Sequence, residues 1–292
     1  MMYFGPAGTP ESFKAMGYRK SEQLPEYLER FGLNAFEYQC GRGVRIGDEA
    51  ARALGEKFAE KGIRISLHAP YYISMSSLDE EKRLGSIRYI LESARAVTAL
   101  GGERIVIHAG STAKMPREQA LELAIDTFRL AIRALDEAGY AHVVPCPEVM
   151  GKIGQLGTLE EVLAMCRVDE RMLPCVDFGH LNARTNGSLK GQADYAAVLD
   201  AIENALGCER ARRLHCHFSK IEYTEKGGEK RHLTFEDQVY GPEFAPLAEE
   251  FARRGYEPTV ICESAGTQAE DARTMMELAE GAILRRMGPQ TR

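Results

Sequence analysis

The chain has 292 residues, of which 44% are hydrophobic and 27% charged, and its formal net charge is −6. This composition is ordinary for a globular protein with a substantial core. The acidic balance excludes a protein whose whole surface is adapted to polyanions, although a local basic patch or bound cations can still attract them. The seven cysteines form no C-x-x-C pair and are odd in number, which indicates reduced thiols. No run is long and apolar enough to span a bilayer, and the first 17 residues do not follow the signal-peptide pattern, so we expect a cytoplasmic protein without a membrane partner.

Eight short apolar runs recur along the chain, and segments of helical periodicity separate them. The predicted strands cover residues 2–5, 35–40, 64–70, 104–110, 142–149, 173–181, 213–221 and 258–264. Alternating strands and helices specify a parallel sheet. Eight units favour closure into a barrel, since no glycine-rich phosphate-binding motif of an open nucleotide-binding sheet is present. We therefore predict an α/β protein in which residues 1–292 form a single (β/α)8 TIM-barrel domain.

Metal-capable side chains interrupt these apolar runs at one end. Buried parallel strands are normally almost purely apolar, yet six consecutive predicted strands end in His, Asp or Glu. These residues are His68, His108, Glu148, Asp177 with His180, His217 and Glu263. Side chains from the carboxyl ends of barrel strands converge on one site, and His and carboxylate groups are ligands of Zn²⁺, Mn²⁺ or Fe²⁺. The pattern predicts a metal centre in which Glu148 can bridge two ions; a metal-free site for a polyol or sugar is the alternative.

Two further histidines need separate interpretation. His215 lies two residues before His217, so it points to the same side of its strand, one layer deeper, where it can support a ligand. His232 lies in a long charged loop, residues 222–237. It either reaches a metal together with His180 or is solvated.

The order of these residues resembles the endonuclease IV family of apurinic/apyrimidinic endonucleases, within the xylose isomerase-like barrel superfamily. The resemblance spans about residues 3–283 and rests on the strings LHAPYYI (67–73), IHAG (107–110), EVMGKIGQLGT (148–158), CVDFGHLNA (175–183), HFSK (217–220), RH (231–232) and CES (262–264). It implies a three-zinc phosphodiesterase that cleaves DNA on the 5′ side of an abasic sugar, with Tyr71 shaping the pocket. By position, one ion would be held by His68, His108 and Glu148, the second by Glu148, Asp177, His217 and Glu263, and the third by His180 and His232.

The sequence departs from that family at two places. The family has an Asp two residues before its loop histidine, where this chain has Lys230, which cannot bind a metal while charged. Glu229 can replace that Asp only if the loop bulges, so we expect two zinc ions and an incomplete third site. The loop that carries a DNA-inserting motif in the family is replaced by residues 38–47, in which the residues able to contact DNA are Tyr38, Gln39, Arg42 and Arg45.

Three functional hypotheses follow. The leading one is a hydrolase acting on damaged double-stranded DNA, with Glu148 and Glu263 as catalytic residues and a monomer whose open barrel mouth admits the duplex. The second is a sugar isomerase or epimerase that uses one Mn²⁺ or Mg²⁺ ion, with Glu148 and Glu263 as paired acid and base. The third is a non-catalytic barrel that binds a metal or a sugar.

Overall fold

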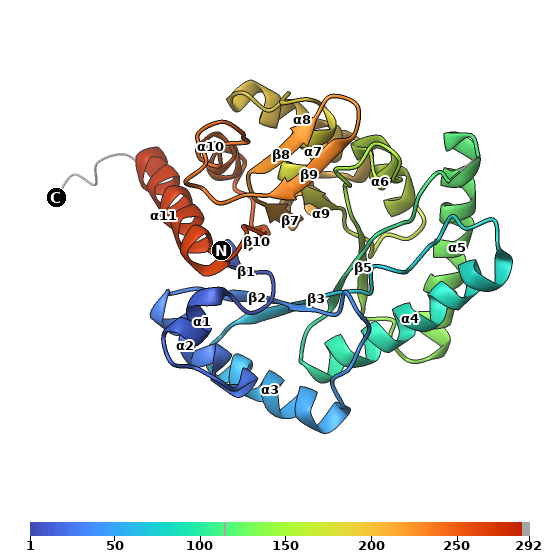
Figure 1. Cartoon of the computed structure of the whole chain (residues 1–292), viewed down its shortest axis with the longest axis horizontal. Helices are drawn as coiled ribbons and strands as arrows, with labels where there is room; N and C mark the ends of the chain where they lie inside the picture. The colour runs from blue at the N-terminus through green and yellow to red at the C-terminus, as the bar shows by residue number, and fades with distance from the viewer. Residues whose placement is uncertain (114, 288–292) are drawn as a thin grey trace.

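The computed structural model describes residues 1–113 and 115–287, and its central feature is a closed ring of short parallel strands (Figure 1). Four strands pair in the order β1-β10-β7-β6 and four in the order β2-β3-β4-β5. Parallel bridges between Ala7 and Glu37 and between Glu148 and Cys175 join the two sheets. The described residues therefore form the predicted (β/α)8 barrel, with strands β1 (Tyr3–Pro6), β2 (Ala35–Gln39), β3 (Arg64–His68), β4 (Arg104–Ile107), β5 (Val144–Pro147), β6 (Cys175–Asp177), β7 (His215–Phe218) and β10 (Thr259–Cys262).

Helices surround this ring and bury the outward faces of the strands (Figure 1). They are α1 (Glu11–Ala15), η1 (Ser21–Gln23), α2 (Leu24–Arg30), α3 (Asp48–Glu60), α4 (Glu80–Ala99), α5 (Arg117–Glu137), α6 (Leu159–Cys166), α7 (Phe178–Arg184), α8 (Gln192–Leu206), α9 (Cys208–Arg212), α10 (Ala245–Arg254) and α11 (Gln268–Met287). None of the helices within the described ranges has the length and apolarity needed to cross a membrane. All seven cysteines are free thiols, as the sequence predicted, and only Cys208 is exposed.

A buried carboxylate connects two of the outer helices. Glu250 of α10 is 2% exposed and accepts hydrogen bonds from Arg253 and Arg254 of the same helix. It also accepts one from Gln192 of α8 at 2.8 Å. Because an unpaired buried charge is costly, these donors are what allows a carboxylate at this position.

The predicted sixth strand is shorter than expected. The prediction for residues 173–181 is wrong beyond Asp177, because the chain turns there into helix α7. The Asp177 side chain accepts a hydrogen bond from the His180 backbone N–H at 2.7 Å and so caps the helix. His180 is therefore a first-turn helix residue rather than a strand-end residue, although it still points toward the same end of the barrel.

The segment predicted as a loop, residues 222–237, contains a β-hairpin instead. Strands β8 (Ile221–Thr224) and β9 (Gly228–His232) pair antiparallel above the barrel mouth (Figure 1). Their register shifts between Glu222 and Tyr223, which is an irregularity of the β-bulge type. The register shift changes which side chains of the facing strand β9 point toward the barrel and which point away from it.

Candidate metal centre

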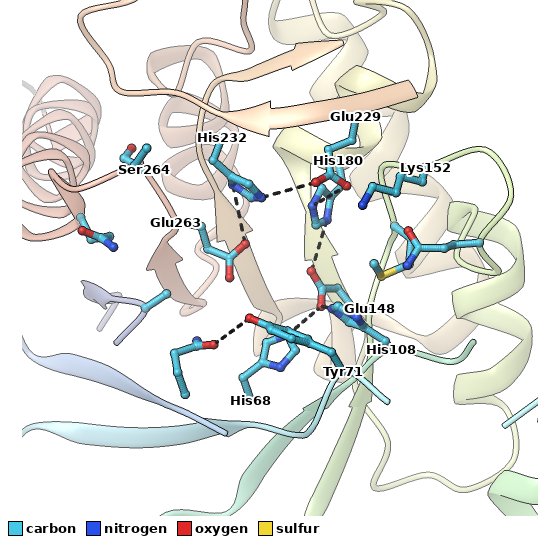
Figure 2. A pocket seen from close by; sticks show the side chains of 16 residues that line it. His68, Tyr71, His108, Glu148, Lys152, His180, Glu229, His232, Glu263 and Ser264 are labelled. Carbon is cyan, nitrogen blue, oxygen red and sulfur yellow. Dashed lines mark hydrogen bonds and ion pairs between the residues drawn. The ribbon is translucent and has the colours of Figure 1, made fainter. Parts of the chain in front are cut away.

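A cavity of about 670 Å³ opens at the carboxyl ends of the barrel strands (Figure 2). Of the predicted ligands, His68, His108, Glu148, His180, His232 and Glu263 line it. Asp177 and His217 are fully buried and lie beneath its floor. The structure thus brings all eight predicted ligand residues to one end of the barrel.

Their donor atoms converge in three groups, in each of which the atoms lie within 4.8 Å of one another. The His68 group consists of His68, His108 and Glu148, and the Asp177 group of Glu148, Asp177, His217 and Glu263. The His180 group consists of His180, His232 and Glu263. Glu148 belongs to the first two groups and Glu263 to the last two, so each carboxylate lies where it can serve two neighbouring ions.

Hydrogen bonds outside the centre orient the histidines. His68 Nδ1 lies 2.8 Å from the Ala69 carbonyl oxygen, which requires a proton on Nδ1 and leaves the Nε2 lone pair free, 3.3 Å from Glu148 Oε2. His180 Nδ1 lies 3.1 Å from the carbonyl oxygen of Val149, which leaves its Nε2 free in the same way. Such partners fix the tautomer of metal-binding histidines, and toward a bound cation these two would present Nε2 as the unprotonated nitrogen.

The buried carboxylates give the centre an excess of negative charge. Burial opposes ionisation of Glu148, yet the surrounding histidines, His108 and His217 foremost, hold its pKa well below the usual range. Burial would lower the pKa of His180, but Asp177 and Glu148 outweigh it and raise that pKa to about 10. The pKa values of His68 and His217 are raised as well, which favours protonated imidazoles beside these carboxylates when no cation is bound.

The donor set fits divalent cations. Burial raises the pKa of Asp177 to about 6, which reflects the cost of its negative charge there. Its Oδ2 atom makes no hydrogen bond within the described structure, although His180 Nδ1 lies 3.0 Å away. A buried acceptor without a donor, close to other carboxylate oxygens and imidazole nitrogens, is the arrangement that Zn²⁺ or Mn²⁺ can satisfy.

The hairpin settles which residue stands beside the His180 group. Lys230 points away from the cavity, is 58% exposed and pairs with Glu222. Glu229 instead turns inward, is 13% exposed, and places Oε2 3.5 Å from His180 Nε2 and Oε1 3.9 Å from His232 Nε2 (Figure 2). The register shift of the hairpin thus supplies the bulge that Glu229 needs in order to take the place of the expected Asp.

The residues expected to contact substrate separate into two sets. Tyr71 and Gln39 line the cavity, and the Tyr71 ring stacks on His108 with ring centroids 5.2 Å apart. Tyr38 packs against the hydrophobic core on the outer side of β2 and does not line the cavity. Arg42 and Arg45 are exposed and also lie outside its lining.

Sequence reasoning missed two charged residues of this region. Lys152 lines the cavity, with its amino group on the side of His180 and Glu229 (Figure 2). Glu37 lies below the cavity, fully buried, with its carboxylate 2.9 Å from His215 Nε2 and 3.0 Å from His217 Nε2. The available signal was the charge of Glu37 itself, which interrupts a strand that is otherwise suited to burial.

Comparison with known proteins gives the family. The xylose isomerase-like TIM barrel family, which includes family 2 AP endonucleases, matches residues 25–281. The chain belongs to this family. An uncharacterized relative from Methanocaldococcus jannaschii is 33% identical over 90% of this chain and 92% of its own length. A probable endonuclease 4 from Sulfurihydrogenibium is 25% identical over 65% of this chain and 68% of its own length, which confirms the resemblance to endonuclease IV.

Solved structures share the barrel fold across nearly the whole chain. A D-tagatose 3-epimerase-like protein superposes with a TM-score of 0.72 and 17% identity, covering 98% of this chain and all of its own. Endonuclease IV from Thermus thermophilus superposes with a TM-score of 0.65 and 20% identity, covering 97% and 98%. At these identities the likeness shows the fold alone, and the choice between nuclease and epimerase depends on the site.

Proposed function

We propose that this chain is a zinc-dependent phosphodiesterase that cleaves DNA on the 5′ side of abasic sites. One observation carries the proposal: a complete His68 group stands beside the Asp177 group and shares Glu148 with it. Two adjacent groups joined by a carboxylate suit a pair of ions, whereas a sugar isomerase needs only the Asp177 group. The relatives named probable endonuclease 4 support the same choice.

The third ion belongs to the same proposal. We infer that His180, His232 and Glu229 hold it, with Glu229 in place of the Asp expected two residues before His232. The contacts of Glu229 with both imidazoles support this role. The outward direction of Lys230 removes the objection that its charge would repel the ion.

Each residue then has a distinct part in the reaction. Bound zinc ions would activate water near neutral pH and offset the charge of the phosphodiester. Glu148 is shared by the His68 and Asp177 groups. Glu263, which lines the cavity and is shared by the Asp177 and His180 groups, would orient the attacking water. Tyr71, over His108, would pack against the abasic deoxyribose once it is flipped out of the duplex, which costs less when no base must be unstacked. We infer that residues 1–292 act as a monomeric single-domain enzyme on damaged double-stranded DNA.

The second candidate is a sugar epimerase that uses one divalent ion. The Asp177 group favours it, since four ligands already make a full site for Mn²⁺ or Mg²⁺ and two of them, Glu148 and Glu263, can act as base and acid. The epimerase-like solved structures share the barrel over nearly the whole chain. A one-ion epimerase would not use the His68 group, so we place the epimerase second.

Nicking of a duplex oligonucleotide with one abasic site tests the proposal. Zinc-loaded protein should cut 5′ to the site and leave the matched intact duplex uncut, and Glu148→Gln should abolish the cut. Intact abasic duplex together with interconversion of ketoses would establish the epimerase instead. Metal analysis gives an independent reading, with two or three zinc ions expected per chain for the nuclease and one exchangeable ion for the epimerase.

A further inference from the structure

Glu37 is a fully buried carboxylate next to the metal centre, and it does not line the cavity. It lies on β2, and its side chain crosses the barrel interior to reach β7. Oε2 accepts from Ser66 Oγ at 2.9 Å and lies 2.9 Å from His215 Nε2. Oε1 accepts from Gln39 Nε2 at 3.1 Å and lies 3.0 Å from His217 Nε2. Both oxygens therefore meet donors, and two imidazoles of the same strand lie within 3.0 Å of the carboxylate, His215 in a hydrogen bond and His217 at ion-pair distance.

The contact with Glu37 decides which nitrogen of His217 faces the metal centre. His217 Nε2 lies 3.0 Å from Glu37 Oε1, at ion-pair distance although outside hydrogen-bond geometry. An ionised carboxylate has no proton to give, so this contact favours the proton of His217 on Nε2. Nδ1 then holds a lone pair, and it lies 3.3 Å from Glu148 Oε1 and 3.6 Å from Glu263 Oε1. His217 thus differs from His68, which turns Nε2 toward the centre and carries its proton on Nδ1, next to the Ala69 carbonyl oxygen.

We propose that Glu37 is a positioning residue of the metal centre, which holds His217 as the Nε2-protonated tautomer so that Nδ1 binds the ion of the Asp177 group. His215 serves the same end from below, because its Nε2–H holds the Glu37 carboxylate at the distance that His217 needs. The inference rests on the proposed metal centre and applies to nuclease and epimerase alike. Carboxylates that accept from a metal-bound histidine raise the basicity of the ligand and fix the orientation of its ring.

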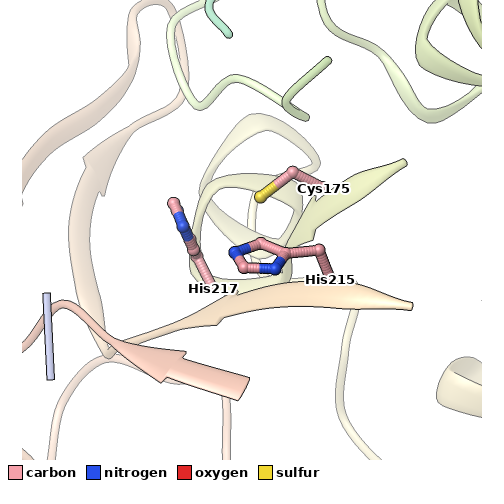
Figure 3. A group of neighbouring side chains, drawn as sticks. All are labelled: Cys175, His215 and His217. Atoms are coloured by element: carbon pink, nitrogen blue, oxygen red, sulfur yellow. The ribbon is translucent and has the colours of Figure 1, made fainter. Parts of the chain in front are cut away.

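A different use of the same region is a separate metal site between Cys175, His215 and His217, whose donor atoms also lie close together (Figure 3). The contacts of the two histidines with Glu37 account for the geometry better. Glu37 already lies within hydrogen-bond distance of both Nε2 atoms, and an ion there would have to displace it from at least one. Burial also raises the pKa of the Cys175 thiol well above its usual value, which disfavours the thiolate that a metal requires.

The first test measures metal affinity in Glu37→Gln by competition with a chelator of known zinc affinity. A Gln offers one acceptor oxygen instead of two, so it cannot serve both imidazoles, and we expect zinc affinity at the Asp177 group to fall about 10–100-fold. Glu161→Gln is the matched control, since Glu161 is also a buried carboxylate but caps α6 away from the centre. Its zinc affinity should equal that of the wild type. Equal zinc affinity in folded Glu37→Gln and in wild type would overturn the proposal.

The second test reads the tautomer in the unaltered protein, so it does not depend on any variant folding. Protein with ¹⁵N-labelled histidine, loaded with ¹¹³Cd²⁺, should show metal coupling to Nδ1 of His217 and a proton on Nε2. Coupling to Nε2 of His217 would overturn the proposal and place the ion on the side of Cys175.

The two proposals fail in distinguishable ways. If wild-type protein binds zinc, Glu37→Gln binds it weakly and neither nicks abasic DNA, the nuclease proposal fails and the role of Glu37 stands. If wild type nicks abasic DNA and Glu37→Gln binds zinc equally well, the role of Glu37 fails and the nuclease stands. Wild type that binds no zinc, Mn²⁺ or Cd²⁺ overturns both.

Discussion

Glu148 belongs to two ligand groups at once, so its replacement should remove two metal-binding contributions to stability. Its Oε2 lies 3.3 Å from His68 Nε2 and 3.0 Å from His108 Nε2, and its Oε1 lies 3.3 Å from His217 Nδ1. A ligand that binds only the folded state stabilises that state by about 2.7 kcal/mol when its free concentration is 100 times its dissociation constant. Two groups together give about 5 kcal/mol, which for a chain of this size raises the midpoint of thermal unfolding by about 10–20 °C.

Glu148→Gln should lose this gain. His232→Asn, which touches only the His180 group, should keep it and lose only the gain from that group, about 2.7 kcal/mol. The measurement is calorimetric unfolding of each protein with chelator and with buffered free zinc. The metal-induced rise is compared within each protein, so a change in the metal-free midpoint does not affect the result. A rise in Glu148→Gln equal to that of the wild type would refute the bridging arrangement.

Three further outcomes follow from the structure. Glu229→Gln should lower the zinc content by about one ion per chain in metal analysis, while Lys230→Ala should leave the zinc content unchanged. The reason is that, of these two residues, Glu229 faces the cavity and Lys230 points away from it. If the substrate is DNA, replacing Arg42 and Arg45 with Ala should weaken DNA binding. The slope of log K against log salt concentration should become shallower by about 1.8, as filter binding at several salt concentrations would show. An unchanged slope would mean that these arginines do not contact phosphates. Hydrogen bonds from the arginines of α10 lower the pKa of Glu250 to about 2, so its contribution of at most about 3 kcal/mol is complete above pH 4.5 and is lost as the pH falls toward 2. Urea unfolding across that range should show Glu250→Gln with a flatter acid limb than the wild type.

The barrel and most of its ligands could be predicted because they depend on local pattern. A polar residue at the end of a short apolar run is visible in the sequence, and the closed parallel barrel brings such ends together whatever the details of packing. His68, His108 and Glu263 needed no further information. Their convergence is a consequence of topology, and topology was encoded in the repeat of strand and helix.

His180 and Glu229 were harder to place because their positions depend on backbone geometry that a pattern does not reveal. The helix that carries His180 starts at a cap supplied by Asp177, which is itself a predicted ligand, so one carboxylate ends a strand and begins a helix. The direction of Glu229 depends on a register shift in a hairpin. Because side chains alternate along a strand, a shift of one residue exchanges the inward and outward faces, and here it turns Glu229 in and Lys230 out.

Glu37 lies in the middle of its strand and not at the end where the ligands gather, although the same physical reasoning applies to both positions. A charge in a buried strand needs a partner wherever it lies. Glu37 on β2 and His215 on β7 are 178 residues apart, and each interrupts its apolar run one layer below the ligands. In a closed barrel the interior at a given layer is shared by strands from opposite sides, so two unpaired polar residues at one depth are each other's natural partners. Pairing such residues by depth, rather than by neighbouring strands, is the step that would have placed Glu37 beneath His217 from the sequence.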